Sequence, residues 1–467
     1  MIVTKFGGTS VQDAAAMKQV ITIIKSKLDR QPIVVLSAAA GITDTLIRCC
    51  QLAHEGKSIE ARELIDDAIV GRYHVLITEL IHDSALRKST LDRIDRYVDD
   101  IRSLIDGLTA TSELSARSLD AIASYGEQFS TAVLSAAMEE FGLESKLIDA
   151  RRVLITDENY GKATPLMDLS AVRAREIILP VIEAGAVPVT QGFIGSTLEG
   201  ATTTLGRNGS DYSAAIIGSL LGAEAVEVWT DVDGILTADP KLVPEAQLLE
   251  TVTFEEASEM AYFGAKVLHP KTTIPLLQKQ IPVHVYNTMR PQSSGTRVVV
   301  SDGRKPQSGR VKTIAYKKDI TVINVHSLRT RLDHSSLRII FGVFNKFETR
   351  IYLVKTSESN VVIAVDDIRH VDLIVDELMD ISAVTVEHEK AVVCLIGEIS
   401  RNNPTIMSRA FSAIRSLKAD AASDGASGLS VSFVINQSDL EVVVQRLHRE
   451  FFGEVAVELS LPAEPSF

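Results

Sequence analysis

A lysine and two glycines come directly after the first predicted strand of the chain. The strand Ile2–Phe6 leads into KFGGTS (residues 5–10), and a helix is predicted over residues 13–28. Paired glycines let the backbone approach a ligand closely, and amides at a helix start bind phosphate oxygens. The Lys5 ammonium is suited to stabilise charge on a phosphoryl group during transfer. An ordinary strand-to-helix turn with a solvated lysine has the same pattern, so this motif alone does not establish a phosphate-binding site.

A second candidate segment is TLGRNGSD (residues 204–211), which precedes a helix predicted over residues 212–221. Arg207 follows a glycine and is suited to bind a substrate carboxylate through two parallel hydrogen bonds. Asp211 falls in the first helical turn, where an acid either favours the helix dipole or orients catalytic ammonium groups. The segment lacks the G-x-x-x-x-G-K-[ST] spacing, which excludes a P-loop enzyme, and the absence of G-x-G-x-x-G argues against a dinucleotide site.

Two further segments carry residues suited to a nucleotide. WTDVDGI (residues 229–235) ends an apolar strand, and open α/β sheets bind nucleotides in crevices at such strand ends. FGAK (residues 263–266) offers Lys266 to a second phosphate. The plainer interpretations are an Asp-Gly turn and a solvated lysine. Shorter candidates are SAAAGIT (37–43), SYGE (124–127) and QGF (191–193).

The elements that must position these residues alternate between strands and helices up to about residue 290. Near-continuous apolar strands are predicted at residues 2–6, 32–38, 146–148, 187–190, 226–229 and 281–286. They predict an α/β fold whose mainly parallel sheet is covered by helices on both faces. A polar helical insertion at residues 55–120 interrupts this order. Its apolar stripe of Leu91, Ile94, Val98, Ile101, Leu104 and Ile105 indicates either a lobe over a site or a packing subdomain.

A segment rich in Pro, Gly and Ser at residues 291–310 is predicted to be a linker. Two small α+β modules follow, at residues 311–390 and 391–467, as a weak repeat of βα elements. Separate strands are predicted at residues 383–387 and 391–397 and a last one at 454–459, whereas residues 419–427 are poor strand formers.

The composition narrows the class of protein. The chain has 467 residues, 45% hydrophobic and 23% charged, which is typical of a globular protein of about three domains. A net charge of -13 argues against nucleic acid and anionic membranes as partners, and any anionic substrate then needs a local cluster of Lys and Arg. Three cysteines form no disulfide framework, and neither a signal peptide nor an 18-residue apolar run occurs, so we expect a cytoplasmic protein.

Seven motifs together resemble the aspartate kinase (aspartokinase) family. KFGGTSV, VVLSAAAGIT, SYGE, TQGFIG, TTTLGRNGSD, WTDVDGI with ADP, and FGAKVLHP occur in the family's order, and the two modules are similar to its tandem ACT domains. The resemblance implies an amino-acid-kinase (carbamate-kinase-like) catalytic domain at residues 1–290. It also implies ATP-dependent phosphorylation of the β-carboxylate of L-aspartate to 4-phospho-L-aspartate, the first step toward lysine, threonine and methionine.

The resemblance further implies roles for the residues that match these motifs. Lys5 and Asp211 are the expected catalytic residues. ATP, whose phosphates are bridged by Mg²⁺, is expected to contact Lys5, Gly7, Gly8, Thr9, Thr230, Asp231 and Lys266. Aspartate is expected to contact Ser37, Thr43, Glu127, Phe193, Arg207 and Ser210, with Arg207 on a carboxylate and Glu127 on the ammonium. At least a homodimer is expected, with an amino-acid effector at ACT interfaces and no metal held by protein ligands alone.

Departures from the family pattern occur in the ACT modules, where they concern regulation, and in the catalytic domain, where Leu236 changes the surroundings of the nucleotide. Tyr352 stands where lysine-sensitive relatives place an aspartate, and Leu236 and Asn208 replace a frequent tyrosine and glycine. We therefore hypothesise that another amino acid, such as threonine, or none controls the enzyme. Two other interpretations stay open: a kinase acting on glutamate or acetylglutamate, and a non-catalytic amino-acid sensor. The helical insertion, Glu127 and the modules argue against the first, and retention of Lys5, Arg207, Asp211 and Lys266 argues against the second.

Overall fold

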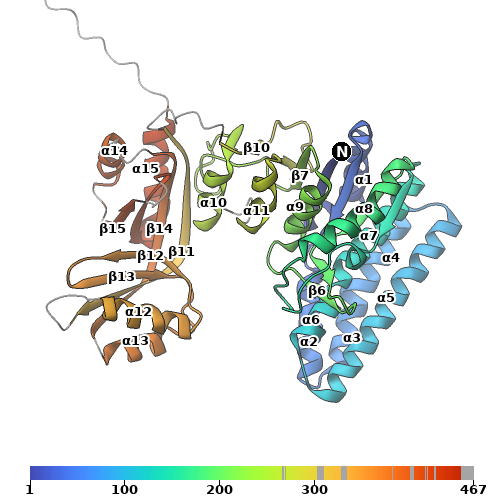
Figure 1. Cartoon of the computed structure of the whole chain (residues 1–467), viewed down its shortest axis with the longest axis horizontal. Helices are drawn as coiled ribbons and strands as arrows, with labels where there is room; N and C mark the ends of the chain where they lie inside the picture. The colour runs from blue at the N-terminus through green and yellow to red at the C-terminus, as the bar shows by residue number, and fades with distance from the viewer. Residues whose placement is uncertain are drawn as a thin grey trace, which may run out of the picture. The chain divides into compact units, whose positions relative to one another are not determined.

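The computed structural model describes residues 1–265, 268, 270–301, 310–327, 334–380, 382–399, 404–415, 417, 419–424 and 428–453. The chain divides into two compact units (Figure 1). The first comprises Met1–Ile235, Leu248–Ser258 and Val267–Asp302, and the second comprises Leu236–Gln247, Glu259–Lys266 and Gly303–Phe467. Two segments of the predicted catalytic domain thus group with the C-terminal part. Among the described residues, no helix has the length and apolarity needed to cross a bilayer.

The first unit is built on an eight-stranded sheet in the order β3-β4-β2-β1-β7-β9-β10-β8. Every neighbouring pair is parallel except β9 with β10. The strands are β1 (Ile2–Phe6), β2 (Pro32–Leu36), β3 (Ser145–Ile148), β4 (Val187–Gln191), β7 (Ala225–Thr230), β8 (Thr251–Thr253), β9 (Val283–Asn287) and β10 (Thr296–Val299). All residues of β1, β2 and β4 are buried, because helices cover both faces. The predicted mainly parallel α/β class is confirmed.

Strand β10 lies inside the segment predicted to be a linker, and that prediction is wrong for Thr296–Val299. Thr296 and Val298 are buried, whereas Arg297 between them is exposed. This short alternation fits one buried strand face, although the surrounding Pro, Gly and Ser residues mask it in the sequence.

Helices of the first unit cover the sheet and extend into a helical lobe. Those outside the lobe include α1 (Ala14–Lys25), α2 (Ile42–His54), α7 (Tyr125–Glu140), α8 (Met167–Glu183), α9 (Gly209–Leu221) and α11 (Pro270–Lys279). The lobe contains α3 (Ser58–Ile65), α4 (Gly71–Leu80), α5 (Ser84–Thr111) and α6 (Ala116–Ala123), with α3, α4 and α5 side by side (Figure 1). Helix α5 buries Ile94, Val98, Ile101 and Ile105, but Leu104 of the predicted stripe is exposed.

The second unit contains one six-stranded antiparallel sheet in the order β12-β13-β11-β14-β16-β15. Its strands are β11 (Arg310–Ser327), β12 (Ile351–Thr356), β13 (Asn360–Val365), β14 (Ser382–Glu398), β15 (Ala419–Asp424) and β16 (Ser430–Asn436). Its helices are α12 (His334–Lys346), α13 (Val371–Met379), α14 (Pro404–Ile414) and α15 (Leu440–Phe452). The two α+β modules therefore share a single sheet.

Two long strands join these modules, which corrects the predicted separate strands at residues 383–387 and 391–397. Strand β14, with 17 residues, runs through both modules and pairs with β11, which has 18 residues. Asp319 and Glu389 adopt positive φ angles of 57° and 55° where the register of this pair shifts, so the chain bends without ending the strand. Strand β15 also forms where a poor strand was expected, and the predicted strand at 454–459 lies outside the described residues.

Segment Leu236–Gln247 belongs to the second unit because it packs on the module that contains α15. Ala238 and Val243 are buried in that module's core. Thr237 Oγ1 lies 2.9 Å from His448 Nε2, and the Tyr316 hydroxyl donates to Asp239 Oδ2 at 2.7 Å. The Ala-Asp-Pro motif at residues 238–240, which follows the predicted nucleotide residues Thr230 and Asp231, is thus part of the second unit.

Candidate active site

A cavity of about 610 Å³ lies in the first unit, where the carboxyl ends of β1, β2 and β4 meet. Parallel neighbours bring these ends to one edge of the sheet. The lining includes both predicted catalytic residues and every residue predicted to contact aspartate: Lys5, Asp211, Ser37, Thr43, Glu127, Phe193, Arg207 and Ser210. The structure therefore brings together in one cavity residues drawn from five separate motifs.

Lys5 and Asp211 form an ion pair inside this cavity. Lys5 Nζ lies 2.6 Å from Asp211 Oδ1, and the lysine is only 7% exposed. Strand β1 holds Lys5 in the middle of the sheet, and Asp211 lies in the first turn of α9. The carboxylate holds the ammonium in one orientation at the positive end of the helix dipole. A fixed cation of this kind is suited to stabilise the charge of a transferring phosphoryl group.

The start of α9 is packed closely against the end of β4. Asn208 caps the helix with a φ of 54°, a left-handed conformation that asparagine tolerates. Gly209 lies so close to the Phe193 ring that an added Cβ would be 2.6 Å from Phe193 Cδ2. The Phe193 N–H donates to Ser213 Oγ at 2.9 Å, a contact that the sequence analysis missed. These contacts fix the turn that carries Arg207 and Ser210.

Glu127 is a buried carboxyl group in the first turn of α7. It is 4% exposed, and its Oε2 has no hydrogen-bond partner among the described residues. Burial raises its pKa to about 8, an effect opposed in part by the backbone N–H of Ala38 and by the Lys5 charge. An unpaired buried carboxyl oxygen in a cavity wall is suited to accept a hydrogen bond from a ligand cation.

The remaining residues of the lining were not predicted individually, although five of them lie in the SAAAGIT and TLGRNGSD segments. They are Ala38, Asp44, Ile47, Leu119, Asp120, Ala123, Gly161, Thr204, Gly206, Asn208 and Gly209. One signal was available for Asp120, because it precedes Glu127 by seven residues and α6 leads into α7 through a single residue, Ser124, with helical φ and ψ. Two turns of helix place both carboxyl groups on one face.

Lys5 lines the cavity, whereas the other described residues predicted to contact ATP lie at two neighbouring strand ends outside its lining. Phe6 pairs with Trp229 in parallel register, and the Gly7 N–H donates to Trp229 O at 3.0 Å. Gly7, Gly8 and Thr9 therefore leave the sheet beside Thr230 and Asp231. Thr230 Oγ1 donates to Asp231 Oδ1 at 3.1 Å. Lys266 lies outside the described residues.

Gly8 and Gly7 provide a matched pair of steric tests. An added Cβ at Gly8 would be 2.7 Å from Ala38 O and 3.2 Å from Ala40 N, both backbone atoms. At Gly7 the nearest atom would be 3.6 Å away, an ordinary contact. We expect Gly8→Ala to lower the free energy of unfolding by about 1–3 kcal/mol and Gly7→Ala to change it by less than about 1 kcal/mol. Urea unfolding measures both, and equal losses would contradict the packing.

Comparisons with known proteins place the chain in a family. The amino acid kinase family model matches residues 1–287, and an ACT domain model matches residues 393–451. Over 460 residues the chain is 33% identical to lysine-sensitive aspartokinase 3 of Escherichia coli (strain K12), covering 97% of this chain and 99% of that relative. The chain belongs to the aspartokinase family. The resemblance carried by the seven motifs is thereby confirmed.

Solved structures of an aspartokinase have the same fold. E. coli aspartokinase III in complex with aspartate and ADP, in its R-state, matches with a TM-score of 0.82 at 33% identity, covering 97% of this chain and all of that chain. The T-state of that enzyme, in complex with lysine and aspartate, matches with a TM-score of 0.81 at 32% identity, covering 97% and 99%. This aspartokinase therefore has both the catalytic and the ACT architecture of its relative.

Proposed function

We propose that this aspartokinase transfers the γ-phosphoryl group of ATP to the β-carboxylate of L-aspartate, giving 4-phospho-L-aspartate and ADP. The observation that carries the proposal is the cavity that gathers Lys5, Asp211 and the six residues predicted to contact aspartate. The relative with which this chain shares 33% identity and a TM-score of 0.82 was solved with aspartate and ADP.

The chemistry requires positioning more than proton transfer. The side-chain carboxylate of aspartate is ionised at pH 7, so the nucleophile needs no general base. Attack by one anion on another requires alignment and neutralised charge. Lys5, held by Asp211 at 2.6 Å, supplies a cation that faces the developing charge on the phosphoryl group.

Recognition of the acceptor uses two charged groups in the cavity. Arg207 binds a carboxylate of aspartate through its planar guanidinium. Glu127, with its unpaired Oε2, accepts a hydrogen bond from the α-ammonium. Ser37, Thr43, Phe193 and Ser210 complete the lining and fix the orientation of the side chain.

ATP is proposed to lie against the neighbouring ends of β1 and β7. The backbone of Gly7, Gly8 and Thr9 binds phosphates, Thr230 and Asp231 contact the nucleotide, and Lys266 offsets a further charge. Mg²⁺ accompanies ATP and neutralises its phosphates. Asp211 and Asp231 offer carboxylate oxygens, the ligand type that Mg²⁺ prefers, at the cavity and at the adjacent strand end.

A panel of acceptors tests the proposed function. The purified chain is given ATP, Mg²⁺, hydroxylamine and one acceptor, and both ADP and the hydroxamate are measured. We expect turnover with L-aspartate and less than about one hundredth of it with glutamate or N-acetylglutamate, since the cavity must align one carboxylate. Preferred turnover of glutamate or N-acetylglutamate would contradict the proposal, and ADP formation with no acceptor dependence would indicate another activity.

We propose that control of this aspartokinase acts through segments of the second unit. In helix α10 (Phe254–Tyr262), the Tyr262 hydroxyl donates to Ile351 O at 3.0 Å and Tyr352 O at 3.1 Å. One turn earlier, Glu259 Oε2 accepts a hydrogen bond from Ser430 Oγ at 3.0 Å. The chain runs directly from α10 to the FGAK motif.

We propose that this aspartokinase is controlled by an amino acid other than lysine, such as threonine, or by none. Tyr352 is buried, its ring centroid lies 5.4 Å from that of Tyr262, and Lys317 Nζ lies 5.3 Å above the ring. This position therefore offers no carboxylate to an effector ammonium. With 5 mM lysine, threonine or methionine added separately, we expect lysine to inhibit by less than about twofold. Strong inhibition by lysine alone would contradict this proposal. Size measurement in the same samples tests the proposed homodimer.

A further inference from the structure

Asp120 lies in the wall of the cavity and ties two segments together. It is 3% exposed and lies near the end of α6. Its Oδ2 accepts hydrogen bonds from the N–H of Gly161 and the N–H of Thr204, both at 2.8 Å. Its Oδ1 accepts a third from Thr204 Oγ1 at 2.7 Å. One carboxyl group thus holds the loop at Gly161 against the end of strand β6 (Thr202–Thr204).

Asp120 and Glu127 differ in what they offer a ligand. Both are buried carboxyl groups that line the cavity. Both oxygens of Asp120 accept hydrogen bonds from the protein, whereas Glu127 Oε2 has no partner among the described residues. Glu127 can therefore accept a hydrogen bond from a substrate ammonium. The oxygens of Asp120 already accept hydrogen bonds from the protein, which indicates a structural role for this carboxyl group.

The segment that Asp120 holds is the one that carries Arg207. Thr204 is the last residue of β6, and Arg207 follows three residues later. Between them, Gly206 has a φ of 80°, and a Cβ at this residue would lie 3.0 Å from Gly161 O. The Ala163 N–H also donates to Thr204 O at 2.9 Å. The backbone that leads from Thr204 to Arg207 is therefore packed against the loop at Gly161. Asp120 holds this loop and the end of β6 together through its hydrogen bonds.

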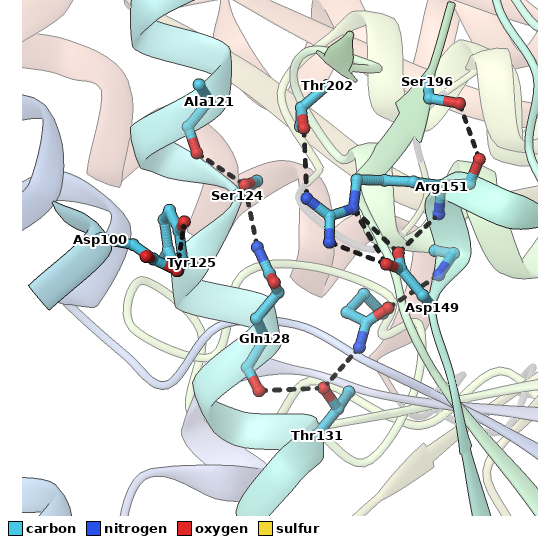
Figure 2. Close-up of polar contacts among 12 residues, drawn as sticks. Asp100, Ala121, Ser124, Tyr125, Gln128, Thr131, Asp149, Arg151, Ser196 and Thr202 are labelled. Carbon is cyan, nitrogen blue, oxygen red and sulfur yellow. Dashed lines mark hydrogen bonds and ion pairs between the residues drawn. The ribbon is translucent and has the colours of Figure 1, made fainter. Parts of the chain in front are cut away.

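Strand β6 pairs with β5 (Ile194–Ser196) in an antiparallel hairpin, and the end of this hairpin near Thr202 is held by other contacts. Figure 2 shows Arg151 reaching Thr202 on β6, where Nη1 lies 3.4 Å from Thr202 Oγ1, and Ser196 of β5 donating to Arg151 O at 2.7 Å. Arg151 is itself held by Asp149 at 2.7 Å. The hairpin is thus fixed away from the cavity by Arg151 and at the cavity by Asp120. The two anchors can be removed independently.

We propose that Asp120 is a positioning residue that orients Arg207 and so sets the affinity of the enzyme for the acceptor amino acid. The inference rests on the proposed function, since Arg207 is taken to bind a carboxylate of aspartate. The proposal predicts that Asp120 affects the binding of aspartate but does not affect the binding of ATP.

Asp120→Asn tests the proposal most directly. The amide carries no charge, so its oxygen accepts weaker hydrogen bonds from the backbone N–H groups of Gly161 and Thr204. Its NH₂ group meets the Thr204 hydroxyl only if that hydroxyl turns from donor to acceptor, so the clamp is loosened. We expect the KM for aspartate to rise by about tenfold or more and the KM for ATP to change by less than about twofold. Thr204→Val removes only the hydroxyl donor at Oδ1, and we expect it to raise the KM for aspartate by about threefold. Thr204→Val keeps the test decisive if Asp120→Asn does not fold.

Two further variants separate positioning from general stability. Ser196→Ala removes a hydrogen bond from the same hairpin at its other anchor, and we expect the KM for aspartate to stay within twofold. In an Arg207→Lys background, we expect Asp120→Asn to have almost no further effect on that KM, because the group that it positions is gone.

Equal rises in both KM values, or additive effects of Asp120→Asn and Arg207→Lys, would overturn the inference. A wild-type chain with no aspartate-dependent ADP formation would instead refute the proposed function. The two failures are therefore distinguishable in the same assay.

Discussion

Lys5→Ala is expected to lower kcat by about 10²–10³-fold while the chain stays folded. The ammonium is the cation that the structure fixes inside the cavity, 2.6 Å from Asp211. Removing one group that stabilises transition-state charge typically costs about 3–4 kcal/mol. Steady-state rates of ADP release give kcat, and circular dichroism with thermal melting tests the fold.

Lys27→Ala serves as a matched control for the loss of an ion pair. Lys27 Nζ lies 3.0 Å from Glu227 Oε1, a buried carboxylate, but neither residue lines the cavity. We expect this variant to lose stability and to keep kcat within about threefold. If Lys5→Ala retained more than a tenth of the wild-type kcat, the catalytic role of Lys5 would be wrong.

Glu127→Gln is expected to raise the KM for aspartate by about 100-fold, because the amide carries no charge to bind the ammonium. In the wild-type chain the KM should fall as the pH rises toward 8, since Glu127 has a pKa of about 8 and must be ionised to bind an ammonium. Well below this pKa, the KM for aspartate should fall by about tenfold for each pH unit. The variant should show no such dependence. Initial rates between pH 6 and 9 measure both effects.

The same substitution is expected to stabilise the folded chain at high pH. Burial raises the folded-state pKa of Glu127 from 4.5 to about 8, so the folded chain binds a proton that the unfolded chain releases within that window. The stability that this proton contributes is complete below pH 4.5 and is lost as the pH rises through 8. Each pH unit in the window costs up to about 1.4 kcal/mol. Urea unfolding at pH 5, 6.5 and 8 should therefore show a growing advantage for Glu127→Gln.

Glu139→Gln provides the control on the same helix, where the side chain is exposed. We expect no change in the KM for aspartate and no growing difference in stability with pH. A wild-type KM that does not vary between pH 6 and 8, together with an unchanged KM in Glu127→Gln, would show that Glu127 does not contact the substrate.

The parallel sheet could be predicted because its buried strands are unbroken apolar runs. Strand β10 could not be predicted, because it is short and is flanked by residues typical of turns. The continuous strand β14 could not be predicted either, because it passes through the polar residues at 388–390. In β14, Glu389 adopts a left-handed conformation that the sequence does not reveal.

Some residues of the candidate site could also be predicted from the sequence, and others could not. Lys5, Arg207 and Asp211 could be identified because each lies in or next to glycines where a predicted strand ends or a predicted helix begins. The ion pair of Lys5 with Asp211 joins residues 206 positions apart, and the packing of α9 against β1 brings them together. Asp120 was missed because its role depends on contacts with Gly161 and Thr204, which are distant in sequence.

The central claim is that the β-carboxylate of aspartate receives the phosphoryl group, and reduction of the product tests it directly. Borohydride converts an acyl phosphate to an alcohol, so a reaction with L-aspartate and ATP can be reduced and the amino alcohol identified by chromatography. Phosphorylation of the β-carboxylate predicts homoserine in an amount equal to the ADP released, and none with Lys5→Ala. The appearance of 3-amino-4-hydroxybutanoate, the product expected from the α-carboxylate, or ADP release without any amino alcohol, would contradict the account.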